Sequence, residues 1–438
     1  MTLLTDTIRT AETSRRFRAY TGKHLDELTA RAGLGPAERL AARAVATVLP
    51  FRTNEYVVEH LIDWSAAPDD PIYRLVFPQP DMLPADDVAR LSDLIARDAP
   101  KAELQAAAGA VRRRLNPHPA GQLELNVPRV DGAPIPGIQH KYPETVLFFP
   151  KQGQTCHAYC TYCFRWAQFI GEPDLKFASD DAAALVAYLR AHPEVTSVLL
   201  TGGDPMIMGE PVLRRYLEPL LELEQLESVR IGSKSLAYWP QRFVTDPDAD
   251  ATLRLFEQVT AAGKNLAFMA HFTHPREMEP ALVRDAAARI ASTGAVIRTQ
   301  APLIRGINDA PQTWARMWRG QLALGMVPYY MFVERDTGPR DYFAVPLARA
   351  HEVFRDAYAA VSGLCRTVRG PSMSATPGKV CVDGVAEIGG RKVFVLHFIQ
   401  ARDPGLVGRP FFAEYDERAL WLTDLRPAFA DRFPHQTA

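Results

Sequence analysis

Short runs of β-branched and aromatic residues alternate with amphipathic helical segments through the middle of this chain. The strand candidates lie at residues 145–149, 197–201, 228–232, 265–272, 295–299 and 327–333, and segments with helical spacing lie between them at 180–192, 212–224, 251–263 and 280–294. Alternating strands and helices form right-handed βαβ units and a parallel sheet. We therefore predict an α/β fold, a partial (β/α)6 barrel of the TIM type, although a doubly wound sheet fits the same alternation.

The flanking regions differ from this pattern. Apolar positions recur at helical spacing in residues 25–34, 37–51 and 55–64, and strand-like runs return at 379–388 and 391–399. We expect a helical N-terminal appendage over residues 1–140, the barrel over 141–380 and a small C-terminal section over 381–438. In either parallel fold the active site belongs at the carboxyl ends of the strands.

The nearly neutral charge balance of the chain argues against a nucleic-acid partner. Lys and Arg number 50 and Asp and Glu 51, which gives a net charge of −1. A nucleic-acid binder usually carries a basic excess or stripe, so we expect no nucleic-acid partner. The N-terminal segment has no long apolar run, and we expect neither a signal peptide nor a membrane span. The expected compartment is the cytoplasm.

Three of the five cysteines, Cys156, Cys160 and Cys163, fall within eight residues as Cys-x3-Cys-x2-Cys. Structural zinc prefers four tetrahedral ligands, commonly in two separated pairs, so zinc is the weaker interpretation. Three thiolates on a 4Fe–4S cluster leave one iron without a protein ligand. That iron can be chelated by S-adenosylmethionine (SAM), and the spacing, with Tyr162 before the third cysteine, resembles the radical SAM signature. The glycines of Thr201–Gly202–Gly203–Asp204–Pro205, after the second strand candidate, resemble the loop that holds the SAM amino group.

Seven segments together resemble the lysine 2,3-aminomutase family. They lie at residues 140–149, 156–166, 199–205, 229–243, 271–275, 298–309 and 327–336, in the family's order. Members of that family use SAM, a 4Fe–4S cluster and pyridoxal 5′-phosphate (PLP) to move an amino group from the α to the β carbon. The resemblance covers roughly residues 52–425.

The resemblance implies roles for further residues of this chain. Lys379, after a glycine run shortened to Gly378, matches the lysine that attaches PLP, and Arg165 matches the arginine that pairs with the substrate α-carboxylate. Lys141 matches an arginine at the PLP phosphate, while a second arginine is replaced by Thr145. Positions near SAM are matched by Thr201, Gly202, Gly203, Asp204, His271 and Gln300. A surface lysine at Lys379, a surface ion pair at Arg165 and a core role for His271 are the structural alternatives.

Two departures from the family concern the substrate side chain and zinc. The aspartates that hold the ammonium of lysine are replaced by Arg335 and Ser374, which predicts an anionic or neutral polar side chain, L-glutamate first. If Asp336 takes the place of Arg335, lysine becomes the expected substrate. The family's interface zinc needs four cysteines, and only Cys365 and Cys381 remain here. We therefore expect no such zinc site, and any homo-oligomer must be held together differently.

These observations predict an isomerase, a PLP-dependent amino-acid 2,3-aminomutase of the radical SAM type. Its expected partners are a small amino acid and a flavodoxin- or ferredoxin-type electron donor. One alternative is a radical SAM enzyme that uses the same scaffold without PLP. Another, from a different class, is a non-catalytic iron–sulfur or zinc protein.

Overall fold

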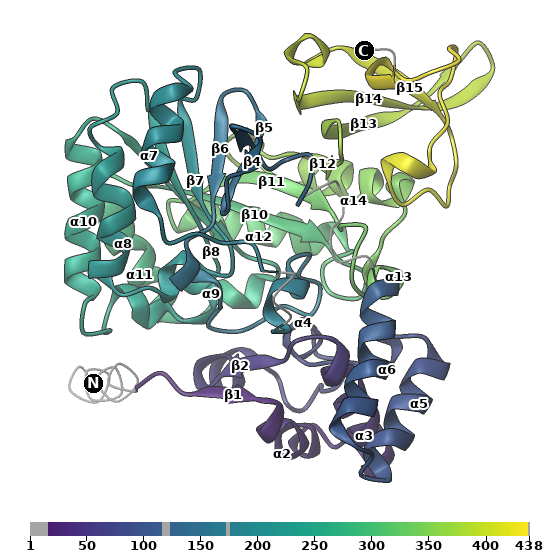
Figure 1. Ribbon diagram of the computed structural model, residues 1–438. Coiled ribbons are helices and arrows are strands. Elements are labelled where there is room, and N and C mark those ends of the chain that lie inside the picture. The colour runs from purple at the N-terminus through teal and green to yellow at the C-terminus, as the bar shows by residue number, and fades with distance from the viewer. Residues whose placement is uncertain (1–15, 116–122, 172–175, 437–438) are drawn as a thin grey trace.

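The computed structural model describes residues 16–115, 123–171 and 176–436, so the start of the N-terminal segment lies outside the described residues. Its main element is a sheet with strand order β15-β14-β13-β12-β11-β10-β9-β8-β7-β6-β5 (Figure 1). Neighbouring strands from β6 to β12 run parallel, and β5 and β13 to β15 pair antiparallel. The strands are β5 (Ile138–Tyr142), β6 (Thr145–Phe148), β7 (Ser197–Leu200), β8 (Ser228–Ser233), β9 (Asn265–His271), β10 (Val296–Leu303), β11 (Val327–Val333), β12 (Arg369–Ser374), β13 (Gly378–Ile388), β14 (Arg391–Ala401) and β15 (Pro410–Glu414).

Helices connect successive parallel strands, as the alternation in the sequence predicts. Figure 1 shows α7, α8, α10 and α11 together outside the sheet. The α/β fold class is therefore confirmed. The connecting helices are α7 (Ala182–Ala191), α8 (Glu210–Leu217), α9 (Ser235–Tyr238), α10 (Ala249–Ala261), α11 (Ala281–Ser292), α12 (Pro311–Ala323), α13 (Arg340–Phe343) and α14 (Leu347–Ala359).

The two faces of the sheet have different environments. On β8, Val229 and Ile231 are fully buried in the main hydrophobic cluster, whereas Arg230 and Gly232 line an internal cavity. Because side chains alternate along a strand, each parallel strand sends one set of residues toward the helices and the other toward this cavity. The inward set carries the candidate chemistry.

The sheet curls into a partial barrel whose ends meet through side chains. In the described parts of the chain, no ladder pairs β5 with β15. Instead, the Lys141 ammonium donates to the carbonyl of Ala375, and Gln400 Nε2 donates to Glu144 Oε1 at 2.7 Å. These contacts bring the β5–β6 end of the sheet beside β13 and β14.

One parallel strand was not predicted from the sequence. Strand β12 contains Gly370 and Pro371 and has no β-branched residue, so neither its composition nor its periodicity indicates a strand. Pairing with β11 on one side and β13 on the other determines its conformation. The parallel part of the sheet is therefore one strand longer than predicted.

The N-terminal residues form mainly helices below the barrel (Figure 1). A short hairpin of β1 (Ala19–Thr21) and β2 (Arg52–Asn54) accompanies them. The α-helices are α2 (Leu25–Arg31), α3 (Pro36–Val48), α4 (Pro71–Val76), α5 (Ala85–Ala96) and α6 (Lys101–Arg114).

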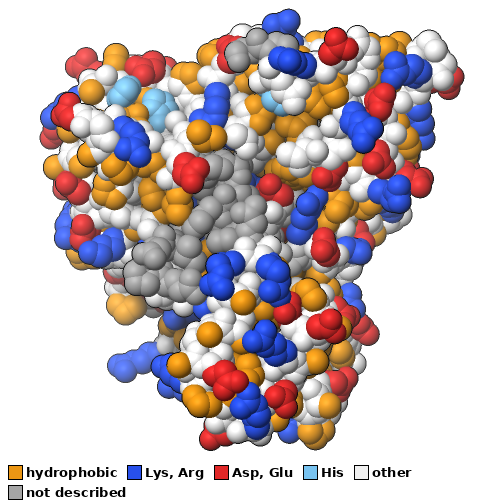
Figure 2. Space-filling model, turned by 45° about the vertical axis from the view of Figure 1, so that its right-hand side comes forward, with side chains coloured by type: hydrophobic (Ala, Val, Ile, Leu, Met, Phe, Trp, Pro, Cys, Tyr) orange, Lys and Arg blue, Asp and Glu red, His pale blue; other side chains and the backbone are white. Residues whose placement is uncertain are grey.

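Strands β13 to β15 extend the sheet and have a hydrophobic cluster of their own, which includes Val380, Leu396, Phe411 and Trp421. Acidic and basic side chains are mixed over the face shown in Figure 2, in agreement with the balanced composition. None of the helices described here is both long enough and apolar enough to cross a membrane.

Candidate active site

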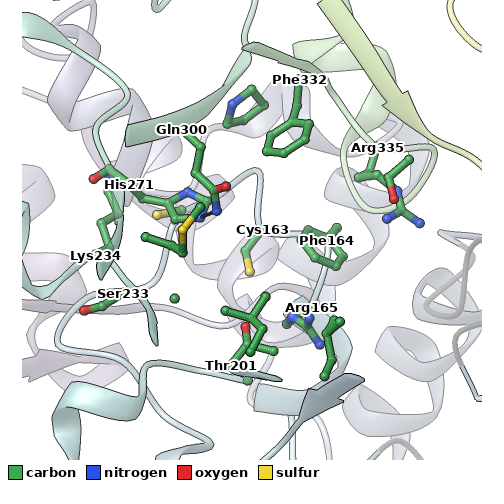
Figure 3. Close-up of a pocket in the computed structure, with 18 of the residues that line it drawn as sticks. Cys163, Phe164, Arg165, Thr201, Ser233, Lys234, His271, Gln300, Phe332 and Arg335 are labelled. Atoms are coloured by element: carbon green, nitrogen blue, oxygen red, sulfur yellow. Dashed lines mark hydrogen bonds between the residues drawn. The ribbon is translucent and has the colours of Figure 1, made fainter. Parts of the chain in front are cut away.

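The inner face of the barrel encloses a cavity of about 330 Å³. Its walls come from the parallel strands, from the loops at their carboxyl ends and from β12 to β14. In Figure 3, His271 and Arg335 lie on opposite sides of the view, with Cys163 between them. Every site residue predicted from the sequence lines this one cavity: Lys141, Cys156, Cys160, Cys163, Arg165, Thr201, Gly202, Gly203, Asp204, His271, Gln300, Arg335, Ser374 and Lys379.

The cysteine loop after β6 is held by the N-terminal region. The backbone N–H of Tyr159 donates to the Arg52 carbonyl at 2.8 Å, and that of Thr161 donates to the Leu75 carbonyl at 2.8 Å. The buried Asn54 amide donates to the carbonyls of His157, at 3.2 Å, and Tyr238, at 3.0 Å. The N-terminal region, predicted only as a helical appendage, therefore fixes the shape of the loop.

The three thiols of the loop are free and lie on the same cavity. Burial raises the pKa of Cys163 to about 12 and also raises that of Cys156 and Cys160. Buried thiols become thiolates when a bound cation compensates the charge. Three soft donors on one loop, beside an open cavity, are a donor set that fits a 4Fe–4S cluster with one free iron.

The glycine-rich loop after β7 packs directly on the cysteine loop. A β-carbon on Gly203 would lie 2.5 Å from the backbone of Thr155, and one on Gly202, where φ is +142°, would lie 2.2 Å from Gln154 Nε2. Only glycine permits this approach. The Asp204 carboxylate accepts from the backbone N–H groups of Met206 and Lys234, each at 2.9 Å. Asp204 therefore holds neighbouring segments in place at the cavity wall, which the rest of the loop also lines.

His271 and Gln300 come from adjacent strands and contact each other inside the cavity. Gln300 Nε2 lies 2.7 Å from His271 Nε2, and burial lowers the pKa of His271 to about 3, so the imidazole is neutral and accepts. Lys234, which the sequence reasoning did not single out, lines the same wall and pairs with the buried Glu277 at 2.8 Å. It lies in the segment at residues 229–243, whose resemblance to the family was the available signal.

Lys379 lies on β13 and points into the cavity. Its Nζ donates to Gln400 Oε1 at 3.2 Å and lies 4.1 Å from the ring centroid of Tyr330. Burial, reinforced by the positive charges of Arg230 and Arg369, lowers the pKa of Lys379 to about 7. A lysine that is partly neutral at physiological pH is a nucleophile suited to Schiff-base formation.

Further basic side chains lie near Lys379. Burial lowers the pKa of Lys141 to about 6, and Arg335, Arg402 and Lys379 contribute to that shift. Arg230, which also lines the cavity and was missed from the sequence, has a buried Nε with no hydrogen-bond partner in the described residues. Thr145 is on the cavity wall as well. A phosphate group would supply the anion that these side chains lack.

Arg165 is almost fully buried beside the cysteine loop. Its guanidinium carbon lies 4.3 Å from the ring centroid of Phe149 and 4.9 Å from that of Phe164. Burial lowers its pKa to about 10, so the group remains a cation near neutral pH. Its Nη1 has no hydrogen-bond partner among the residues described. A buried cation with an unused donor is suited to bind a carboxylate.

Arg335 lines the cavity and Asp336 does not. The Arg335 guanidinium lies 5.0 Å from the Phe164 ring centroid, and its Nε is 3.6 Å from Asp336 Oδ1. Its Nε and Nη2 make no hydrogen bond within the described part of the chain. Neighbouring Glu334 is buried, which raises its pKa well above the usual value and favours the uncharged acid. The charge of Arg335 is therefore only partly compensated within the protein.

A partial α/β barrel with three cysteines and a glycine-rich loop at the carboxyl ends of its strands defines a radical SAM enzyme. The chain is 31% identical over 90% of its length to "Putative L-lysine 2,3-aminomutase" of Aquifex aeolicus, of which it covers 92%. It therefore belongs to the lysine 2,3-aminomutase family.

Further relatives and one solved structure match at lower identity. The chain is 28% identical to L-lysine 2,3-aminomutase of Acetoanaerobium sticklandii over 58% of this chain and 59% of that protein. The chain is 26% identical to the L-lysine 2,3-aminomutase of Escherichia coli, over 57% of this chain and 69% of that protein. A solved radical SAM methyltransferase from Sphaerobacter thermophilus matches at 15% identity with a TM-score of 0.38, over 65% of this chain and 93% of that one. No family model matches the chain.

Proposed function

We propose that this protein is an amino-acid 2,3-aminomutase that depends on SAM, a 4Fe–4S cluster and PLP, and that its substrate has an anionic or neutral polar side chain. L-glutamate is the first candidate. The observation that carries the proposal is that Arg165, Lys379 and Arg335 line one cavity with the three cysteines. In this enclosed space Arg165 provides a cation for the substrate carboxylate, Lys379 an amine nucleophile and Arg335 a second cation.

The donor sets of the cavity fit the three cofactors. Cys156, Cys160 and Cys163 would hold the cluster, and Lys379 would attach PLP. The loop at residues 201–203, with His271 and Gln300, would contact SAM, and Lys141 and Arg230 would neutralise the PLP phosphate. When bound, the cluster and SAM supply a 5′-deoxyadenosyl radical, and PLP supplies a π system that delocalises an unpaired electron.

Arg165 would hold the substrate by its α-carboxylate. A guanidinium binds a carboxylate bidentately, which fixes both position and orientation. Phe149 and Phe164 lie against this guanidinium, and the arginine is almost fully buried. Such positioning matters because one C–H bond must be presented to the radical and the others kept away from it.

Arg335 would select the substrate side chain. Only 13% of this side chain is exposed, so an ammonium held opposite it would leave two like charges in a poorly solvated site. A carboxylate would instead accept charge-assisted hydrogen bonds, worth about 1.5–3 kcal/mol each. Ser374 lies on the same cavity, directly across from Lys379 in the β12–β13 ladder, and adds a neutral hydroxyl.

Two alternative functions can be tested by the same experiments. A preference for lysine would require the Asp336 carboxylate to reach the cavity. Asp336 does not line the cavity, which supports an acidic substrate over lysine. A radical SAM enzyme without PLP requires Lys379 to be unmodified, and the lowered pKa of that lysine supports attachment.

An anaerobic assay of the reconstituted protein with SAM, PLP, dithionite and each common amino acid tests the proposal. We expect a β-amino acid from L-glutamate or another acidic or polar substrate. Borohydride reduction followed by peptide mapping should locate PLP on Lys379, which separates the aminomutase from a PLP-independent enzyme. A non-catalytic iron–sulfur or zinc protein would show no SAM cleavage after reduction.

A further inference from the structure

A second group of metal-ligating side chains lies outside the cavity, on β13 and β14. Cys381, Asp383 and His397 place one ligand atom each within 4.8 Å of one another. His397 Nδ1 lies 2.6 Å from Asp383 Oδ2. None of the three lines the cavity. The proposed aminomutase mechanism uses none of these side chains.

The strand register brings these residues together. Cys381 and His397 are direct cross-strand partners. The register then shifts between Val382 and Gly384, which leaves Asp383 as the extra residue of a bulge. Bulges redirect side chains, and residues two apart on a strand share a face. The thiol, the carboxylate and the imidazole therefore gather on one face of the two strands.

Another histidine approaches the same place from α14. This helix packs against β13, and His351 Nε2 would lie 3.8 Å from a β-carbon on Gly384. The group is also partly open to solvent, with 38% of the Asp383 side chain and 31% of the His397 side chain exposed. The group therefore has a route of entry for an ion, and a water molecule can supply a fourth ligand.

We propose that Cys381, Asp383 and His397 bind one Zn²⁺ ion. A thiolate, an imidazole and a carboxylate are the donor types that zinc accepts in tetrahedral sites. One thiolate and one carboxylate neutralise the two charges of the ion, which removes the cost of burying the thiolate. The site is independent of the four-cysteine interface zinc that the sequence lacks. Cys381 lies two residues after Lys379 on β13, so a bound ion would link the strand that carries this lysine to β14.

Metal analysis of the intact, cluster-loaded protein tests this site without relying on activity. After addition of ZnSO₄ and gel filtration, we expect about one zinc per chain in the wild type. Cys381→Ser and His397→Ala should lose most of that zinc while their iron content stays unchanged. Cys365→Ser and His192→Ala should keep it. His192 is a matched control because its Nδ1 also lies close to a carboxylate, 2.9 Å from Glu194 Oε1, but no cysteine belongs to that pair.

X-ray absorption at the zinc edge distinguishes this site from zinc bound in the cysteine loop. We expect one sulfur at about 2.3 Å with nitrogen and oxygen at about 2.0–2.2 Å, whereas the loop would give three sulfurs. Should His397→Ala not fold, Asp383→Asn provides a milder variant with the same expected loss of zinc. Equal zinc in all variants, no zinc in the wild type, or a three-sulfur spectrum would each overturn the proposal.

Discussion

Arg165 and Arg335 lie against the same aromatic ring: their guanidinium carbons are 4.9 Å and 5.0 Å from the centroid of Phe164. Each has at least one buried nitrogen without a hydrogen-bond partner in the described residues. Two buried cations that share one apolar surface are suited to a ligand with two separated carboxylates. This relationship supports an acidic amino acid more directly than either residue does alone.

Replacing Arg335 with alanine should reduce kcat/KM for L-glutamate by roughly 10- to 150-fold, because one charge-assisted hydrogen bond worth about 1.5–3 kcal/mol is lost. Arg335→Asp should increase turnover of L-lysine. Steady-state kinetics on both amino acids measure these effects, and Asp336→Ala is the matched control. Efficient lysine turnover by the wild type that disappears in Asp336→Ala would contradict the acidic substrate.

Each of the substitutions Cys156→Ala, Cys160→Ala and Cys163→Ala should abolish SAM cleavage and lower iron well below about four atoms per chain. The reason is that a site with two thiolates no longer holds the cluster. Iron analysis after anaerobic reconstitution and assay of 5′-deoxyadenosine provide the measurements. Cys365→Ala should behave like the wild type, and full activity in any loop variant would refute the assignment.

Lys379 should react with PLP most readily above neutral pH. Its pKa is lowered from 10.5 to about 7, so the reactive neutral amine predominates above that pH and is lost as the pH falls through it. The attachment rate in cofactor-free protein should therefore rise between about pH 6 and 8 and then level off. Stopped-flow absorbance follows the reaction, with Lys379→Ala as the unreactive control. A midpoint near 10 would show that this lysine is solvated.

Asn54→Ala should weaken the hold on the cysteine loop. Its buried amide donates hydrogen bonds to the carbonyls of His157 and Tyr238. Each buried carbonyl left without a partner lowers the free energy of unfolding by about 1–3 kcal/mol. We expect a lower thermal midpoint and faster loss of iron to a chelator. Asn265→Ala, at an exposed position on β9, is the control and should change neither quantity.

The sequence by itself determined the strand–helix alternation, the cysteine spacing and the order of the motifs. These features are local, because periodicity and spacing depend on neighbouring residues along the chain. They predicted the α/β class. Through the resemblance to the family they also implied the candidate site residues, which line the same cavity apart from the alternative Asp336.

Only the tertiary structure decided which of Arg335 and Asp336 faces the cavity, because both follow β11 in a loop where strand alternation no longer applies. It also decided the extra parallel strand, since Gly370 and Pro371 adopt that conformation only between partners. The N-terminal contacts to the cysteine loop are made largely through backbone carbonyls, which every residue type possesses. Likewise, the pairing of Cys381 with His397 depends on register between strands, which no local pattern records.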